Sequence, residues 1–407
     1  MPERILYGVQ GEGRGHAARS MQVIQWLADH GHQVRVLTGG DAMQVLRDRG
    51  FDIFEIPQLR CCYRADGTLA RWRTIRGYGP RALGLLFGIG ASFRQVAELV
   101  DEFRPDLLIS DFEPYLSRLA GMRGIPLLAI NHQHFLIESV LPPLTGWRKK
   151  LSLKLHQLGI SLLVGQPDRI ITSSFFHFPR KSNSRAVFVG TFIPDRLGRL
   201  EVRRGDSVVV YLKQPGLARY LVPHLAARPH RRFLIFSDWR GDPPENLPGH
   251  VRLAPIDRER FLWELARCRA LVTTAGNQAI GEAIFLGKPV LAFPEPGQLE
   301  QELNALALDR SGLGESFDIK RFSAETWDRF EARETAFRAN IERHMRSRRP
   351  FDGRAEALRA VRRFLRETGS GAGHHRRDGV AAREPAGVSP SSLAPPFPAD
   401  EGGGHAR

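Results

Sequence analysis

The first half of the chain alternates short, mostly apolar runs with longer stretches of mixed polarity. Each apolar run is followed by glycine or by polar residues, and the stretches between the runs have helical spacing of their apolar positions. This pattern is typical of buried parallel strands that alternate with amphipathic helices. We expect strands at residues 4–9, 34–37, 53–56, 106–110, 125–130 and 168–172, the last of them closing a first domain.

A second series of apolar runs follows a charged segment at residues 191–206, which contains Pro194 and predicts a linker. Beyond Gly314 the chain becomes charged with helical spacing, and from Gly369 its periodicity disappears while Gly, Pro, Ser and Ala increase. The second series of strands is expected at residues 207–212, 233–236, 251–253, 271–274 and 290–294. The predicted units are domains at 1–193 and 207–335, helices at 336–368 and a disordered tail at 369–407.

Residues 271–305 carry the most specific pattern. A β-branched run ends at Thr274, a turn follows, and the next apolar residues predict a helix that carries Glu282. The free N–H groups and the dipole at the start of such a helix favour an anion, and a diphosphate suits that place. Glu282, about two turns into the helix, is placed to accept hydrogen bonds from two hydroxyls of a sugar linked to that phosphate.

This ordered set resembles the donor-binding segment of GT-B glycosyltransferases, especially the MurG-like enzymes with a glycosyltransferase family 28 C-terminal domain. The resemblance implies contacts to the donor diphosphate from Thr274, Ala275, Gly276 and Asn277, to the ribose from Glu282, and to the donor sugar from Glu300 and Gln301. Plant-type relatives have histidine where Thr274 stands, so phosphate contact here would rest on a hydroxyl and backbone amides. Lys213 resembles a further phosphate contact.

The same resemblance implies the fold: α/β, with two Rossmann-like domains whose parallel sheets face a central cleft. The first domain would bind the acceptor and the second the nucleotide sugar. In GT-B proteins, C-terminal helices often return to the first domain, and we expect this of residues 336–368.

The loop after the first strand, residues 10–16, is rich in glycine. Gly11 and Gly13 make half of a dinucleotide-binding fingerprint, but His16 stands at the third glycine position and no acidic residue ends the second strand, which disfavours NAD. Gly15-His16 instead resembles the glycine cluster of MurG-like and glycolipid glycosyltransferases, which implies that His16 is the general base and that Gly15 lies against the donor. Imidazole suits removal of a hydroxyl proton. Capping of the following helix is the alternative role for His16.

Polar residues gather at the ends of two further strands, where parallel sheets place their sites. Asp111 and Glu113 follow one strand, and Asn131-His132-Gln133-His134 follow the next. We expect Glu113, His132, Gln133 and His134 around the acceptor, and Asp111 either orienting His16 or binding substrate. Asp111-x-Glu113 is not the Asp-x-Asp motif of metal-dependent glycosyltransferases, so no metal is expected.

The chain carries 59 Lys and Arg against 44 Asp and Glu, a net charge of +15. Anionic nucleotides, anionic lipids and nucleic acid are candidate partners, and an arginine-rich proteome is an alternative explanation. No nucleic-acid-binding motif accompanies the charge. Arginines and aromatic residues at 59–94 beside an apolar run, and lysines around the apolar residues 151–164, suit either a segment lying on anionic lipid or a solvated loop beside a buried helix.

Three cysteines show neither a disulfide framework nor zinc-ligand spacing. The N-terminus lacks signal-peptide features, and the longest weakly polar run, residues 82–91, is about half of a membrane span. These features favour the cytoplasm, with peripheral attachment to the inner face of the plasma membrane as a further option.

Together these patterns predict a metal-independent glycosyltransferase without a further cofactor. It would move a sugar from a nucleotide donor, expected to be UDP-linked, to a hydroxyl acceptor, for which a lipid or a cell-envelope glycan is a candidate. A UDP-sugar 2-epimerase on the same fold and a non-catalytic sugar-nucleotide-binding protein are the alternatives. The donor sugar, the acceptor, the stereochemical outcome and the oligomeric state are left open by the sequence.

Overall fold

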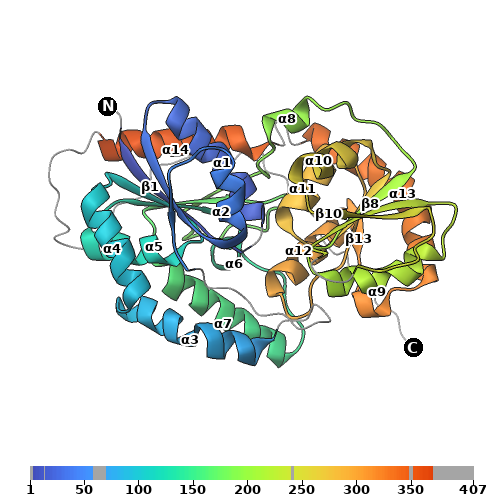
Figure 1. Cartoon of the computed structure of the whole chain (residues 1–407), viewed down its shortest axis with the longest axis horizontal. Helices are drawn as coiled ribbons and strands as arrows, with labels where there is room; N and C mark the ends of the chain where they lie inside the picture. Colours follow the sequence, from blue (N-terminus) through green and yellow to red (C-terminus); the bar gives the residue numbers. More distant parts are fainter. Residues whose placement is uncertain (1–2, 13, 58–69, 240–242, 348–351, 370–407) are drawn as a thin grey trace.

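The computed structural model describes residues 3–12, 14–57, 70–239, 243–347 and 352–369. Two α/β domains lie side by side, each built on one parallel sheet (Figure 1). This confirms the two Rossmann-like domains expected from the sequence. The predicted tail beyond residue 369 and the first part of the basic segment, residues 59–69, lie outside the described residues.

The first sheet has seven parallel strands in the order β3-β2-β1-β4-β5-β6-β7. Its alternate residues face opposite sides, so that Ile5 and Tyr7 of β1 enter one core cluster and Leu6 enters another. The strands are β1 (Arg4–Val9), β2 (Gln33–Thr38), β3 (Ile53–Glu55), β4 (Leu107–Asp111), β5 (Leu127–Asn131), β6 (Arg169–Ser173) and β7 (Ala186–Val189). The prediction that residues 168–172 form the last strand is wrong, because β7 pairs with β6 and buries Ala186 and Val189 at the edge.

Helices cover both faces of this sheet. Apolar residues of α1 and α2 pack on one face, and those of α4 and α5 pack on the other. The helices of the first domain are α1 (Arg14–Asp29), α2 (Gly40–Arg47), α3 (Arg71–Phe87), α4 (Ala91–Phe103), α5 (Pro114–Arg123), α6 (Phe135–Glu138) and α7 (Trp147–Val164). A short helix, α8 (Asp195–Gly198), lies in the predicted linker.

The second sheet has six parallel strands in the order β10-β9-β8-β11-β12-β13. These strands are β8 (Ser207–Tyr211), β9 (Arg232–Ser237), β10 (Val251–Pro255), β11 (Ala270–Thr273), β12 (Val290–Ala292) and β13 (Gly314–Ser316). The accompanying helices are α9 (Pro215–Ala226), α10 (Arg258–Arg267), α11 (Asn277–Phe285), α12 (Leu299–Ser311), the 3-10 helix η1 (Ile319–Arg321) and α13 (Ala324–Ser347). Helices α11 and α12 lie on the side that faces the first domain (Figure 1).

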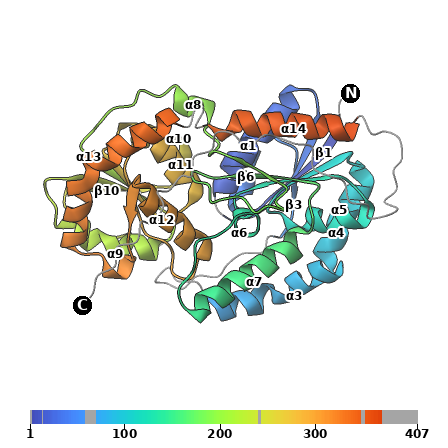
Figure 2. The same ribbon diagram turned by 180° about the vertical axis from the view of Figure 1, so that it is seen from behind.

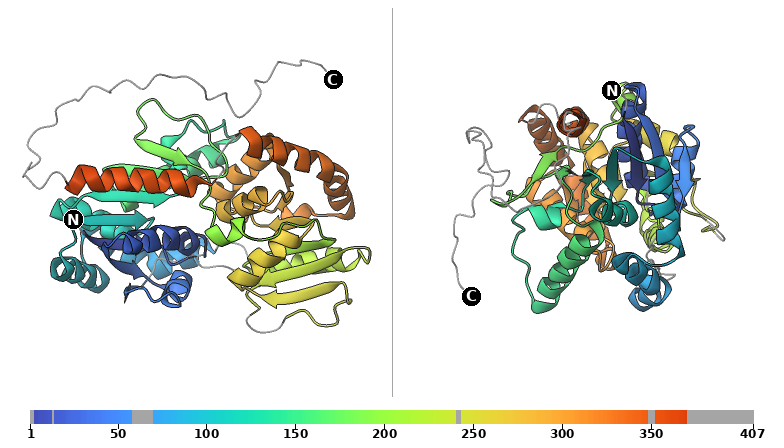
Figure 3. Two further views of the ribbon diagram at one scale, coloured as in Figure 1. Left: turned by 90° about the horizontal axis from the view of Figure 1, so that it is seen from above. Right: turned by 90° about the vertical axis from the view of Figure 1, so that its left-hand side faces the viewer.

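The two C-terminal helices belong to different domains. Helix α13 packs on the second domain through Trp327, Phe330 and Phe337, so the predicted boundary at 335/336 falls inside a helix. Helix α14 (Gly353–Gly369) crosses back and covers β6 and β7 of the first domain, as expected from the resemblance (Figures 2 and 3). Its residues Val361 and Phe364 join the core cluster that also holds residues of β1 and α1.

A single hydrophobic cluster joins the domains. It combines Phe135, Phe175 and Phe176 of the first domain with Ile280 and Leu303 of the second. Since this contact removes apolar surface from water, it holds α11 and α12 against the first domain.

Within the described residues, no single helix is both long and apolar enough to cross a membrane. The residues Gly79–Phe87 and Ala91–Phe103 meet that test only as a pair, which bends by 42°.

Phe364 provides a test of how much α14 contributes to the first domain. We expect Phe364→Ala to lower the free energy of unfolding by about 3 kcal/mol, because it removes a buried ring and leaves a cavity. Denaturant unfolding followed by circular dichroism measures this loss. Arg363→Ala, on the exposed side of the same helix, is the control and should stay within about 0.5 kcal/mol of the unchanged protein. Equal, small effects of both changes would show that α14 is not part of the core.

Candidate active site

A cavity of about 720 Å³ lies between the carboxyl ends of the two sheets. The first domain lines it with the loops that follow β1, β4 and β5, and the second domain with the loops that follow β8, β11 and β12. In parallel α/β sheets these strand ends are where ligands bind. The cavity thus gathers, from distant parts of the sequence, the loops that carry the predicted site residues.

His16 enters this cavity from the first turn of α1. Its Nδ1 lies 2.8 Å from Asp111 Oδ1, at the end of β4. Since an ionised carboxylate only accepts hydrogen bonds, the proton of the neutral imidazole is on Nδ1, and Nε2 keeps a free lone pair. This arrangement suits a general base oriented by a buried carboxylate, as in the histidine and aspartate of hydrolytic triads.

Asp111 itself is completely buried and does not reach the cavity. Arg19 donates to both of its oxygens, at 3.0 Å and 2.6 Å, and the Ser20 hydroxyl donates to Oδ2 at 2.8 Å. Burial alone would raise the pKa of Asp111, but the Arg19 guanidinium and His16 outweigh it and hold the pKa below its ordinary value. Of the two roles expected for Asp111, the geometry fits the orientation of His16.

The backbone after Asp111 is strained. Phe112 has a φ of 57°, a left-handed conformation that is uncommon for a bulky residue, and its side chain lines the cavity. Glu113, next in the chain, caps α5 and holds the turn in place. Such strain persists only where the surroundings fix it, and it is frequent at functional sites.

Across the cavity, α11 presents its N-terminus. Gly276 is the N-cap residue and no side chain caps the helix, so its first N–H groups are available to a ligand. Thr274 and Gly276 line the cavity. Gly15 of the first domain is so near that a Cβ there would lie 3.7 Å from Gln278 Cβ. The glycine next to His16 therefore meets the start of the helix that was expected to hold the donor diphosphate.

Comparison with known proteins agrees with this geometry. The model of the family described as glycosyl transferase family 1 matches residues 3–333. This chain belongs to that family. It is therefore a glycosyltransferase, as the sequence predicted.

Its relatives include uncharacterised glycosyltransferases of Methanosarcina. One from M. acetivorans is 27% identical over 335 residues, covering 76% of this chain and 82% of the relative. One from M. mazei is 24% identical over 334 residues, covering 76% of this chain and 85% of the relative.

Solved structures with the same fold include glycosyltransferases of natural products and of MurG type. The kitacinnamycin glycotransferase has a TM-score of 0.65 at 19% identity, covering 89% of this chain and 99% of its own. The calicheamicin glycosyltransferase CalG4 has a TM-score of 0.64 at 19% identity, covering 91% and 100%. MurG of Acinetobacter baumannii has a TM-score of 0.55 at 14% identity, covering 89% and 100%. These likenesses confirm the GT-B fold.

The predicted donor contacts of this glycosyltransferase separate into two groups. Those that line the cavity are Gly15, Lys213, Thr274, Gly276, Asn277, Glu300 and Gln301. Ala275 and Glu282 do not line it, because both side chains are completely buried. Direct contact of Glu282 with the ribose, as expected from the resemblance, is therefore not what the structure shows. Instead, Arg258 pairs with the Glu282 carboxylate and itself lines the cavity.

Asn277 contributes to the cavity differently from the expectation. Its side-chain oxygen accepts from Phe175 N at 3.0 Å, and its amide nitrogen donates to Ser173 O at 3.1 Å. The side chain therefore joins the domains, and what Asn277 offers to a donor is its backbone N–H. Lys213 pairs with Asp41 of the first domain at 2.7 Å across the cleft.

The acceptor candidates also separate. Gln133 lines the cavity, and its buried Oε1 has no hydrogen-bond partner among the described residues. His132 lines it too, but both ring nitrogens are engaged, with Ser173 O and Asn304 Oδ1, each at 2.9 Å. The unsatisfied oxygen of Gln133 makes it the better placed of the two to receive an acceptor hydroxyl.

Two acceptor predictions are wrong. Both Glu113 oxygens accept backbone N–H groups of α5, from Tyr115 at 3.0 Å and Leu116 at 2.9 Å, and burial raises its pKa to about 7. His134 bonds Asn131 Oδ1 at 2.7 Å within its own turn, and burial lowers its pKa to about 4. Neither side chain lines the cavity. Strand-end position alone did not separate capping residues from ligand contacts.

Sequence analysis missed several cavity residues, among them Arg19, Arg258 and Glu295. Arg19 follows His16 by three residues on a helix, so the i, i+3 spacing was the signal that could have found it. Burial raises the pKa of Glu295 to about 7, and its backbone N–H bonds Gln301 Oε1 at 2.9 Å. Among the described residues, no group of three or more His, Cys, Asp or Glu side chains is placed to hold a metal ion.

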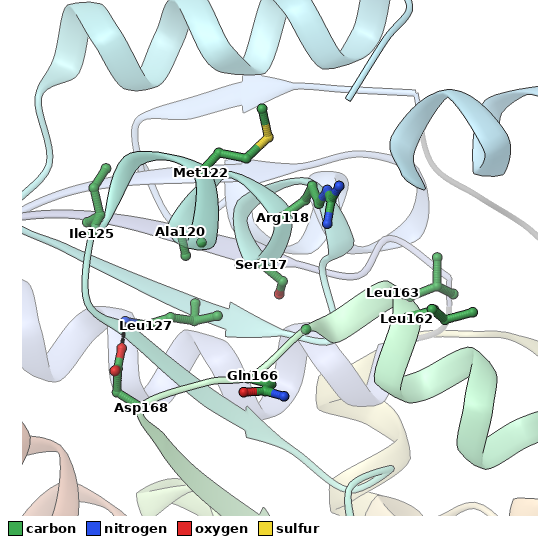
Figure 4. Close-up of a pocket in the computed structure, with 12 residues that line it drawn as sticks. Ser117, Arg118, Ala120, Met122, Ile125, Leu127, Leu162, Leu163, Gln166 and Asp168 are labelled. Atoms are coloured by element: carbon green, nitrogen blue, oxygen red, sulfur yellow. Dashed lines mark hydrogen bonds between the residues drawn. The ribbon is translucent and has the colours of Figure 1, made fainter. Parts of the chain in front are cut away.

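A second cavity, of about 400 Å³, lies between α5 and the end of α7 (Figure 4). Two of its polar side chains make structural hydrogen bonds. Asp168 accepts from Leu127 N at 2.9 Å, and Ser117 donates to Glu113 O at 3.0 Å. It contains none of the predicted site residues, so the chemistry is assigned to the cleft.

The corrected role of Glu113 can be tested. We expect Glu113→Ala to lower the free energy of unfolding by about 1 to 2 kcal/mol, because α5 loses its cap. Transfer activity at temperatures where the variant stays folded should match that of the unchanged enzyme. Thermal unfolding and initial rates measure the two effects. A folded, stable variant without activity would restore Glu113 to the acceptor site.

Proposed function

We propose that this glycosyltransferase moves a sugar from a nucleoside diphosphate donor to a hydroxyl acceptor without a metal ion. The observation that carries this proposal is the opposition of the His16–Asp111 pair and the uncapped N-terminus of α11 across one cavity. His16 would remove a proton from the attacking hydroxyl, and the start of α11 would stabilise the negative charge that develops on the leaving group.

The reaction follows from this placement. The acceptor oxygen attacks the anomeric carbon and gives its proton to His16 Nε2, while Asp111 and Arg19 keep the ring oriented. The bond between the anomeric carbon and the diphosphate oxygen breaks as the new glycosidic bond forms. Charge that grows on the diphosphate meets the N–H groups and the dipole of α11. Lys213 also lines the cavity, and it would have to exchange its partner Asp41 for the diphosphate to take part.

A uridine nucleotide, expected from the resemblance, is the first donor to test. In the GT-B fold, the spinosyn rhamnosyltransferase SpnG has been solved with thymidine diphosphate and with the spinosyn aglycone. That a nucleoside diphosphate and an acceptor both bind in this fold supports a nucleotide donor and a separate acceptor here. The reaction would take place in the cytoplasm.

His16 provides the test of this mechanism. We expect His16→Ala to lower kcat by roughly 100- to 10,000-fold, because the general base is lost. The dissociation constant of the nucleoside diphosphate, measured by calorimetry, should change by less than about threefold, because α11 is unaffected. His30→Ala, at the exposed residue directly after the same helix, is the control. Equal losses of binding and turnover in His16→Ala would contradict the assignment of His16 as a base.

The acceptor side of the cavity indicates a lipid acceptor. Gly79 and Ala82 of α3 and His156 and Ile160 of α7 line it, and these helices lie side by side below the first sheet (Figures 1 and 2). The outer face of α7 carries four leucines that are 48–58% exposed, Leu151, Leu155, Leu158 and Leu162. Their i, i+4, i+7, i+11 spacing puts them in one stripe.

We propose that this leucine stripe lies on an anionic lipid bilayer, so that the acceptor hydroxyl reaches the cavity from the membrane. Lys150 and Lys154 are exposed beside the leucines, and α3 adds exposed Phe87 and Arg76. Apolar side chains flanked by cations suit the interface of an anionic leaflet. The net charge of +15 has the sign that such a leaflet attracts.

Vesicle sedimentation tests the stripe. The unchanged protein should sediment with phosphatidylglycerol-rich vesicles and not with phosphatidylcholine vesicles. The double variant Leu155→Ser, Leu158→Ser should bind these vesicles at least about tenfold more weakly, because two inserted side chains are lost. Val202→Ser, at an exposed apolar residue of the linker, is the control. Dimerisation through the stripe, with no sedimentation with either kind of vesicle, would contradict the proposal.

A further inference from the structure

The acceptor side of the cavity has a wall that comes from three segments of the first domain. Helix α3, the turn and short helix after β5, and helix α7 contribute to it, and Leu136 and Ile160 belong to one hydrophobic cluster. We call this surface the acceptor wall, and its residues are Gly79, Ala82, Gln133, Leu136, His156 and Ile160. Four of the six have no polar side-chain atom, so the side chains of Gln133 and His156 supply its hydrogen bonds.

His156 enters the cavity from the inner face of α7. It precedes the buried Ile160 by one turn, whereas the half-exposed leucine stripe lies on the opposite face of the helix. Within the described residues, both hydrogen-bond contacts of the ring are to Ser152 and use Nδ1, which lies 2.7 Å from Ser152 O. Because a carbonyl oxygen only accepts, Nδ1 carries the proton of the neutral ring, and Nε2 has a free lone pair.

Gln133 supplies a second hydrogen-bond acceptor. Its Oε1 is buried and has no partner among the described residues. Together with Nε2 of His16, the general base of the proposed reaction, an acceptor molecule therefore meets three lone pairs. A hydroxyl can donate to such a lone pair, whereas the ionised oxygens of a phosphate offer only lone pairs of their own. The three positions suit a molecule with several hydroxyls.

The charges around the cavity also disfavour a second anion beside the donor diphosphate. Among the described residues, the Lys and Arg side chains that line the cavity are Arg19, Lys213 and Arg258, and each already pairs with a carboxylate. None of them belongs to the acceptor wall. An anion without a counterion against an apolar wall has a large desolvation cost, which a neutral amide and a neutral imidazole do not balance. An uncharged headgroup avoids this cost.

We propose that the acceptor is an uncharged lipid with a polyol headgroup, and that His156 and Gln133 select it by accepting hydrogen bonds from hydroxyls beside the one that reacts. These two side chains determine specificity, and they exchange no proton with the reacting oxygen. Anionic lipids of the bilayer attract the outer surface of the protein without entering the cavity. This inference rests on the proposed function, since it names the acceptor of the same reaction.

Two soluble probes with the same alkyl chain test this selection. Octyl β-glucoside has a neutral headgroup with several hydroxyls, and octyl phosphate has an anionic one. Calorimetry on the full chain, with uridine diphosphate or, if that does not bind, thymidine diphosphate present, gives the dissociation constant of each probe. We expect the unchanged enzyme to bind the glucoside at least about tenfold more tightly than the phosphate. His156→Phe and Gln133→Leu should each weaken glucoside binding by roughly five- to tenfold, because one hydrogen bond is lost.

A conservative variant separates the hydrogen bond from packing. His156→Gln keeps a hydrogen-bond acceptor at this position and should bind the glucoside within about threefold of the unchanged enzyme. His230→Phe, at an exposed residue of the second domain, is the matched control and should change the affinity for neither probe. Nucleotide affinity, measured on each variant, should stay within about threefold and shows that the donor half is intact.

The remaining outcomes contradict either the inference or the proposed function. Octyl phosphate that binds as tightly as the glucoside overturns the inference, and so does a nucleotide-bound enzyme that does not bind the glucoside. Unchanged glucoside affinity in His156→Phe and Gln133→Leu overturns it too, and if one of these variants does not fold, the other decides. Failure of the unchanged enzyme to bind either nucleotide contradicts the proposed function itself, and the inference with it.

Discussion

Buried polar contacts between the two domains determine the geometry of the cleft. Asn277 bonds the backbone at Ser173 and Phe175, and Gln278 bonds Phe192 O. Asn304 accepts from His132 at 2.9 Å and donates to Ala275 O at 2.9 Å. Because a buried amide that loses its partner has a desolvation cost, each of these contacts favours the observed placement of the two domains. They place the start of α11 opposite His16, and the catalytic arrangement depends on that placement.

Most of the fold could be predicted from the sequence, because buried strands consist of short apolar runs that are visible in it. Strands β1 and β4 are examples, since they lie between helices on both sides and carry short apolar runs, residues 5–7 and 107–109. The edge strand β7 was missed as a member of the sheet, because Val187 is 44% exposed and its pattern is short. The boundary inside α13 was missed because charge and helical spacing continue through both C-terminal helices.

The sequence predicted which turns and glycines lie at the cavity better than it predicted which side chains point into it. Gly15, Thr274 and Gly276 lie on the cavity, where the sequence placed them. Glu113 and Glu282 are acidic residues near strand ends or on the motif helix, yet both satisfy other protein groups. The partner that captures Glu282 is Arg258, 24 residues earlier in the chain. Such pairings depend on tertiary packing, and no spacing in a single sequence predicts them.

Each domain has, next to the cleft, a buried carboxylate that is paired with an arginine. Asp111 and Glu282 are both completely buried, and each is held by an arginine with two contacts. A buried carboxylate needs such a partner to remain charged. In the first domain, Asp111 also contacts His16, which lines the cavity. In the second domain, Glu282 contacts Arg258 and Gln278, and these two side chains line the cavity.

The connections between the domains also restrict how the cleft can open. The chain leaves the first domain through residues 190–193 and returns beside them at Asp352 and Gly353, where Gly353 N bonds Thr191 O at 3.0 Å and Ile193 N bonds Asp352 Oδ1 at 3.1 Å. A Cβ at Gly353 would come within 2.0 Å of Gly190 O, so the two crossings touch and leave no room for a side chain there. Thr191 is packed as closely against Gly281 of α11. Both crossings therefore lie together, and α11 packs directly against one of them.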